Sequence, residues 1–189
     1  MYIAIVKKLK EREIQIMSIA SKAGGISYKF ANDKFGISMR RLNNLVQTGY
    51  LEKHIIYQVE NEKIKNRYVY DLGDKGKCYV KEAGICSITQ GFNGYKHLLK
   101  TEEVVYRLVK EEYINIKEIL NEKEQIEKFE DRISYAKSRG IDFRVNDLAV
   151  VSNNEVRSIE IDTGYSNKLK TQHRNYAELI LNVVYESIS

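Results

Sequence analysis

Apolar residues recur at helical spacing through the first quarter of the chain. In the segment Ile14–Ala23 they gather on one face of a helix, and the two glycines that follow permit the left-handed backbone that ends a helix. Ser27 is placed to cap a short second helix that reaches Phe35. Ser38 is placed to cap a third helix, whose apolar face includes Leu42. The spacing predicts three short helices, of which the last two form a helix-turn-helix.

The pattern changes to strands after the third helix. Tyr50–Val59 is rich in residues that favour strands, residues 60–62 can form a turn, and Lys65–Leu72 resumes the strand pattern. A β-hairpin directly after a helix-turn-helix is typical of a winged helix. We therefore predict an N-terminal winged helix-turn-helix domain over residues 8–88, and an α+β chain overall.

The second half alternates helical and strand patterns, which predicts a small α/β domain over residues 96–189. A helix is expected from Thr101 to Lys110, with Glu102 and Glu103 in its favourable first turn. The charged run from Glu122 to Arg132 predicts a solvated helix face with pairs such as Glu124 and Lys128. Two strands are expected at 147–151 and 156–162, and no further core strand after Tyr185.

The expected register of these two strands brings acids together. If Asn153 and Asn154 form a two-residue hairpin turn, Asp147 lies opposite Glu160, with their Cβ atoms ~4.5 to 5.5 Å apart. Asp162 then projects from the same face, two residues further on. Like charges this close are destabilising unless a cation offsets them, and carboxylates are ligands that Mg²⁺ or Mn²⁺ prefers. Asp147 and Glu160 are therefore candidate metal ligands.

Charge divides the chain into two unlike halves. The net charge is +5, but residues 1–95 carry 16 Lys and Arg against 9 Asp and Glu, while residues 96–189 carry 15 against 17. A net +7 on the first half favours a polyanion as its partner. The cations coincide with the elements that winged helices present to duplex DNA, so we predict DNA contacts from the third helix (Arg40, Arg41) and from the wing (Lys63, Lys65, Arg67).

Several protein classes are excluded by what the sequence lacks. No run approaches the ~20 apolar residues of a spanning helix, and the apolar stretch at the start is too short for a signal peptide, so we expect a cytoplasmic protein without a membrane partner. Cys78 and Cys86 form no metal-binding pattern; we expect both to be reduced, with Cys78 packed inside. The three histidines contain no H-x-H pair, which excludes the histidine triad of tyrosine relaxases.

Several segments together resemble one family. Leu72–Tyr79 looks like the segment that follows the wing in many bacterial winged helices, and Glu160-Ile161-Asp162-Thr163-Gly164 precedes a helix containing Lys168, Lys170 and Tyr176. This second block resembles the replication-relaxation family of plasmids and integrative elements. The resemblance implies a winged helix joined to a nuclease-like core, acting at an origin. Replication or conjugation proteins would then be partners.

The two acidic strands also resemble the PD-(D/E)-x-K motif of restriction-endonuclease-like nucleases. This sequence departs from the motif twice, because Asn146 replaces the proline and Asp162 replaces the lysine. Lys170, or else Lys168, could supply the missing cation from the following helix. Gln172 and Tyr176 resemble the Q-x-x-x-Y signature of the RecB-like branch, where such residues position DNA.

Three functions stay open from the sequence. In the first, the protein acts on mobile-element DNA, either nicking it or organising it for a partner; a nickase would use Asp147, Glu160, Asp162 and Lys170 as catalytic residues with Mg²⁺ or Mn²⁺. In the second, it is a transcription regulator whose silent nuclease-like domain dimerises or senses a signal. In the third, it is a general metal-dependent nuclease. A homodimer would suit a palindromic site, although no heptad repeat marks an interface.

Overall fold

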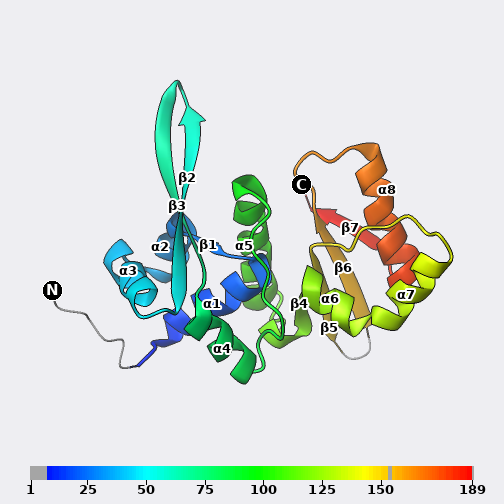
Figure 1. Cartoon of the computed structure of the whole chain (residues 1–189), viewed down its shortest axis with the longest axis horizontal. Helices are drawn as coiled ribbons and strands as arrows, with labels where there is room; N and C mark the ends of the chain where they lie inside the picture. Colours follow the sequence, from blue (N-terminus) through cyan, green and yellow to red (C-terminus); the bar gives the residue numbers. More distant parts are fainter. Residues whose placement is uncertain (1–7, 153–154, 189) are drawn as a thin grey trace.

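The computed structural model describes residues 8–152 and 155–188. Within these ranges the chain forms a mixed α+β fold of eight α-helices and two small sheets, one of three strands and one of four (Figure 1). None of the helices in the described part combines the length and apolar character that a membrane crossing requires.

The first half forms a three-helix unit with a long hairpin. Its elements are α1 (Glu11–Ala23), β1 (Ile26–Ser27), α2 (Tyr28–Phe35), α3 (Met39–Gln47), β2 (Leu51–Glu60), β3 (Lys63–Leu72) and α4 (Asp74–Glu82). The Ser27 hydroxyl accepts a hydrogen bond from the Phe30 N–H and caps α2, while Ser38 caps α3 in the same way through the Arg41 N–H. The predicted helices and caps are confirmed.

The hairpin formed by β2 and β3 projects from the body of the protein (Figure 1). Its two loop residues, Asn61 and Glu62, have φ angles of 50° and 62°, as the right-handed twist of a two-residue hairpin requires. The strands pair from Leu51 with Leu72 to Glu60 with Lys63, so β3 begins two residues earlier than predicted. The sheet order β1-β3-β2 leaves β2 at an edge.

The second half builds a mixed sheet with helices around it. Its elements are α5 (Tyr95–Lys110), a 3-10 turn (Ile116–Glu118), β4 (Ile119–Asn121), α6 (Glu122–Lys128), α7 (Glu130–Ser138), β5 (Leu148–Ser152), β6 (Glu155–Ile161), α8 (Asn167–Asn175), a π-helical turn (Tyr176–Leu181) and β7 (Tyr185–Ile188). The sheet order is β4-β5-β6-β7. The last pair is parallel and is connected through α8, so the expectation that no core strand follows Tyr185 is wrong.

The predicted register of β5 and β6 is confirmed. Leu148 pairs with Ile159 and Val150 with Arg157, so the pairing places Asp147 beside Glu160 at the start of β5. The Asp147 N–H donates to Glu160 Oε2 at 3.2 Å, and the Ile161 N–H donates to Asp147 Oδ2 at 2.8 Å. The turn predicted at Asn153 and Asn154 lies outside the described residues.

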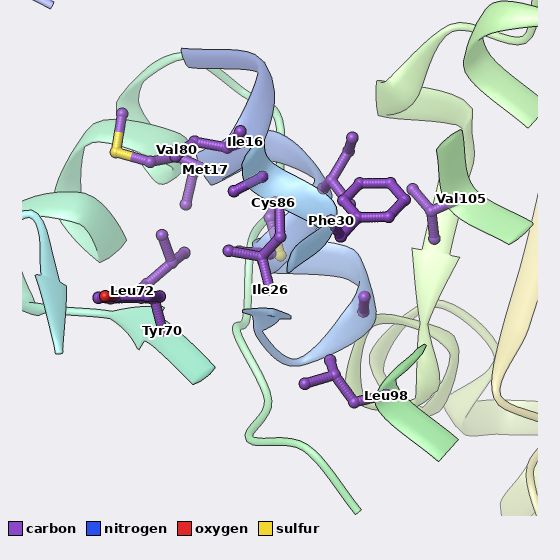
Figure 2. Packing of buried hydrophobic residues seen from close by; sticks show 14 of the residues in the cluster. Ile16, Met17, Ile26, Phe30, Tyr70, Leu72, Val80, Cys86, Leu98 and Val105 are labelled. Atoms are coloured by element: carbon purple, nitrogen blue, oxygen red, sulfur yellow. The ribbon is translucent and has the colours of Figure 1, made fainter. Parts of the chain in front are cut away.

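One hydrophobic cluster runs through both halves. Side chains of α1, α2, β3, α4 and α5 meet in it, as Figure 2 shows for Ile16, Phe30, Tyr70, Val80 and Val105. The same cluster continues into the second sheet through Ile119, Leu148, Val150, Ile159 and Ile161. Although α5 was predicted to belong to the second domain, it packs against α1. A second, smaller cluster packs Phe129, Ile133, Ala136, Tyr176, Ile180 and Leu181.

A buried ion pair crosses the boundary between the halves. Lys22 Nζ on α1 lies 2.7 Å from Glu124 Oε2 on α6, and both side chains are buried. Glu124 also accepts hydrogen bonds from the N–H groups of Asn121 and Ser87. The sequence-based pairing of Glu124 with Lys128 on a solvated face is therefore wrong, because α6 turns this carboxylate toward α1.

Two other expectations, the position of Glu102 in its helix and the burial of Cys78, are wrong. Because α5 starts at Tyr95, Glu102 lies in its middle rather than in its first turn. Its buried carboxylate instead accepts hydrogen bonds from the N–H and hydroxyl of Ser27. Cys78 is exposed on α4, and Cys86 is the buried cysteine.

Candidate functional site

The candidate residues fall into two separate sites, a cationic surface in the first half and an acidic centre in the second. The cationic surface is formed by α3 and the hairpin. Arg40 is exposed near the N-terminus of α3, where a neighbouring polyanion could reach it. Among the predicted DNA contacts on this helix, Arg40 is the one whose position fits a surface role.

Arg41 instead forms an ion pair within the protein. Its Nε donates to Glu13 Oε1, and its second terminal nitrogen donates to Glu13 Oε2 at 2.8 Å, so both carboxylate oxygens of a fully buried side chain are engaged. Burial by itself would raise the pKa of Glu13, but hydrogen bonds from Arg41 and from the Lys10 N–H outweigh it and lower that pKa. Arg41 therefore holds α3 against α1, and its predicted DNA contact stays a prediction for a side chain already paired with Glu13.

The hairpin cations share one face. Residues at alternate positions of a strand point the same way, so Lys63, Lys65 and Arg67 form a row. Lys63 and Lys65 are exposed, and the half-buried Arg67 donates a hydrogen bond to Gln58 across the hairpin at 3.2 Å. All three residues lie in the half of β3 next to the turn, and the hairpin as a whole projects from the body (Figure 1).

The acidic centre contains two histidines beside the two predicted carboxylates. We call His97, Asp147, Glu160 and His173 the acid–histidine cluster. His97 Nε2 on α5 lies 2.9 Å from Asp147 Oδ1, and His173 Nδ1 on α8 lies 3.2 Å from Glu160 Oε2. All four side chains are nearly or fully buried, with exposed fractions of 11%, 13%, 0% and 8% in the order of the definition.

Burial dominates the electrostatics of this cluster. Burial, followed by the negative charge of Asp147, raises the pKa of Glu160 to about 9, so the Glu160 carboxyl is protonated at neutral pH. Burial likewise lowers the pKa of His173. Burial and the charge of Asp147 also raise the pKa of the nearby Glu122. The cluster thus holds less charge than its residue types suggest.

Asp162 lies outside the cluster in a different environment. Lys170 Nζ lies 2.7 Å from Asp162 Oδ2, and the N–H groups of Gly164 and Tyr165 donate to Asp162 Oδ1. The hydrogen bond from Lys170, and then those from the two backbone groups, hold the pKa of Asp162 well below its usual range. Asp162 and Lys170 are brought together as predicted, but as partners of each other that fix the turn before α8.

The two residues predicted to position DNA, Gln172 on α8 and Tyr176 in the π-helical turn that follows, also make contacts within the protein. Gln172 donates from its amide to Asp142 Oδ1 at 2.7 Å. Tyr176 is fully buried, and its ring stacks on Phe143 with a centroid separation of 6.1 Å. In this structure the side chain belongs to the second core cluster and does not lie on the surface where its predicted role would place it.

The acidic centre has donors of the kind that a hard divalent cation needs. Asp147 and Glu160 offer carboxylates side by side, and Glu160 Oε1 is buried without a hydrogen-bond partner. Both Asp147 oxygens, however, are already paired, one with His97 and one with the Ile161 N–H. Within the described residues, no three or more His, Cys, Asp or Glu side chains stand in an arrangement that could hold a metal ion.

Sequence reasoning did not place the histidines in this centre. His97 and His173 are 76 positions apart, and both reach the carboxylates from helices that pack on the sheet. The available signal was weak, because both histidines stand among polar residues, Lys96 before His97 and Gln172 and Arg174 on either side of His173. Only the packing of α5 and α8 against β6 brings them together.

No protein-family model matches the sequence, and neither the curated proteins nor the solved structures contain a match to the chain.

Proposed function

We propose that this protein binds double-stranded DNA through an N-terminal winged helix, with α3 as the recognition helix and the β2–β3 hairpin as the wing. The observation that carries the proposal is the coincidence of exposed cations with these two elements: Arg40 on α3, and Lys63 and Lys65 on the hairpin. Cations on the elements that reach DNA favour a nucleic-acid partner more than the same charge spread over a surface would.

We further propose that the second half is a nuclease-like domain that organises DNA for a partner protein. The resemblance to the replication-relaxation family points to an origin on a plasmid or integrative element. The organising role is supported by the internal engagement of the predicted catalytic groups. Asp147 is paired with His97, Lys170 with Asp162, and Glu160 is protonated at neutral pH. Replication or conjugation proteins are the partners this role requires.

Selection from a pool of random duplexes, followed by gel mobility shifts over a range of salt concentrations, tests the binding proposal. Wild type should enrich a defined sequence, and its affinity should fall steeply with salt because phosphate contacts release counterions. Arg40→Ala should weaken binding, whereas Lys137→Gln, an exposed cation of α7, should leave it unchanged. Failure of the wild type to shift any duplex at low salt would overturn the proposal.

The regulator alternative differs in the DNA it selects. A regulator should protect one short pseudo-palindromic operator and bind it as a homodimer, whatever the concentration of Mg²⁺. Light scattering of the complex on the selected duplex decides between one and two copies. A single copy on an asymmetric site supports the origin-binding role.

Metal-dependent strand nicking is a second candidate, favoured by the unpartnered Oε1 of Glu160 beside Asp147. These two carboxylates would hold the ion, which would polarise the phosphate and its attacking water. Lys170 would have to leave Asp162 before it could stabilise charge on the phosphate. Supercoiled plasmid incubated with Mn²⁺ or EDTA tests this candidate. Open circles formed by wild type and by the control Glu155→Gln, but not by Glu160→Gln, would establish nicking.

A further inference from the structure

The helix α3 carries a polar face that the packing of the protein does not use. Leu42 and Leu45, both fully buried, hold the other side of this helix against the body. Because an α-helix has 3.6 residues per turn, the positions opposite those two leucines follow from the sequence. The residues at these positions are Arg40, Asn43, Asn44 and Gln47. We call these four side chains the outer face of α3.

The outer face is open to a partner. Arg40 and Gln47 are exposed, and Asn43 and Asn44 are partly buried. Within the part of the chain that the structure describes, none of the four side chains forms a hydrogen bond or an ion pair with the rest of the protein. The helix contains no acidic residue, so no carboxylate on α3 itself opposes an approaching polyanion. Figure 1 shows α3 beside the base of the hairpin, on the side away from the second half.

Three of these four side chains are uncharged amides, which decides what the face can recognise. A surface that binds phosphates alone gains its attraction from Lys and Arg, and amides add no charge to it. The amide of Asn or Gln instead places a donor and an acceptor side by side, which match the N7 and N6 of adenine. Arg40 offers two parallel donors, which match the O6 and N7 of guanine. The outer face therefore suits base edges in the major groove.

The length of the outer face sets how many base pairs it spans. At a rise of 1.5 Å per residue, Arg40 and Gln47 are about 10.5 Å apart along the helix axis, and the two asparagines lie between them. Base pairs of duplex DNA are about 3.4 Å apart, so this length equals about three base-pair steps. The major groove is wide enough to admit an α-helix. A helix that lies along the groove thus meets all of these base edges within about four base pairs.

We propose that the outer face of α3 determines the sequence specificity of this protein: Arg40 reads a guanine, and the three amides read adenines within about three base-pair steps of it. This inference rests on the proposed function, namely that the protein binds duplex DNA through α3, and adds to it the bases that the helix selects. A wrong base leaves the guanidinium or amide groups without their partners in the complex, and this loss is the source of discrimination.

The probe is the duplex that wild type selects from a random pool, in its normal form and with 7-deazaguanine at each guanine in turn. This base lacks the N7 acceptor in the major groove and keeps its Watson–Crick pairing. At one guanine the replacement should lower the affinity of wild type, measured by fluorescence anisotropy, at least about fivefold, the low end for a bidentate pair. Arg40→Ala should bind the normal duplex more weakly and should not respond to that replacement.

The adenines are tested in the same way with 7-deazaadenine, against Gln47→Ala and the double variant Asn43→Ala, Asn44→Ala. At least one replacement should weaken binding by wild type and leave binding by one of these variants unchanged. The matched control Asn167→Ala removes an exposed amide at the start of α8 and should respond to every replacement as wild type does. Circular dichroism verifies that each variant is folded.

Each other outcome overturns the inference in a recognisable way. If wild type tolerates 7-deaza bases at every position, or selects no defined sequence, base reading by α3 is rejected and DNA binding is left intact. If Arg40→Ala responds to each replacement as wild type does, its guanidinium contacts phosphate and not guanine. If wild type shifts no duplex at low salt, both this inference and the proposed function are rejected.

Discussion

The two candidate sites of this protein differ in what their charged groups face. On α3 and the hairpin, Arg40, Lys63 and Lys65 are exposed, at the surface where a macromolecule can reach them. In the acid–histidine cluster the ionisable groups face one another, and Glu160 is wholly buried. The first arrangement suits binding of a partner, and the second suits stabilising a fold or holding an ion. Similar numbers of ionisable residues therefore support different roles, and the comparison can be tested from both sides.

The largest effect is expected where the two halves are joined. Lys22→Met removes the partner of the buried Glu124, and breaking a buried pair from one side costs about 3–5 kcal/mol. Urea denaturation should show a lower midpoint for the whole protein, because one hydrophobic cluster spans both halves. The double variant Lys22→Met, Glu124→Gln should recover part of the loss. An unchanged midpoint in the single variant would contradict the coupling of the halves.

Substitution of the two adjacent arginines on α3, one at a time, should separate an effect on stability from an effect on DNA affinity. Arg41→Ala leaves the buried Glu13 carboxylate without its main donor and should cost about 2–3 kcal/mol of unfolding free energy. Arg40→Ala should change stability by less than about 0.5 kcal/mol and reduce DNA affinity. Thermal melts and gel shifts on both variants give the comparison. Equal losses of stability would show that the assigned roles are wrong.

The acid–histidine cluster predicts a pH dependence with a definite sign. The pKa of Glu160 is raised from 4.5 to about 9, so the folded state binds more protons than the unfolded state in that interval. The contribution of this group to stability is fully present below pH 4.5 and is lost as the pH rises toward 9. Glu160→Gln cannot ionise and should be more stable than wild type at pH 8, with no gain at pH 4.

Melts of Glu155→Gln, a change at an exposed position of the same strand, provide the control for that pH series. Added Mn²⁺ sharpens the test. If the ion raises the melting temperature of wild type and not of Glu160→Gln, the cluster holds a metal and the contrast between the two sites is reduced. A melting difference independent of pH would mean that Glu160 is not the titrating group.

The smallest expected effect is at the hairpin. Lys63→Gln should reduce the slope of log affinity against log salt by about 0.9, the value for one phosphate contact. Its stability should be that of wild type, because the side chain is exposed. Mobility shifts at four or five salt concentrations measure the slope. An unchanged slope would remove Lys63 from the DNA surface.

Local elements were determined by the sequence. Serines 27 and 38 cap helices, the turn at Asn61 and Glu62 closes the hairpin, and the register of β5 and β6 is the one expected for a two-residue turn between them. Such features depend on neighbours within a few residues or on one strand pair, so propensity and periodicity are enough to predict them.

Only the tertiary structure decided which charged groups are buried and paired inside the protein. Glu13 lies 28 positions from Arg41, and Lys22 lies 102 positions from Glu124, yet each pair is closed by helix packing. The sequence alone does not distinguish a charged residue that faces water from one that is paired inside the protein, because burial depends on elements far away in the chain. The sequence therefore placed Asp147 beside Glu160, and the fold added the two histidines that surround them.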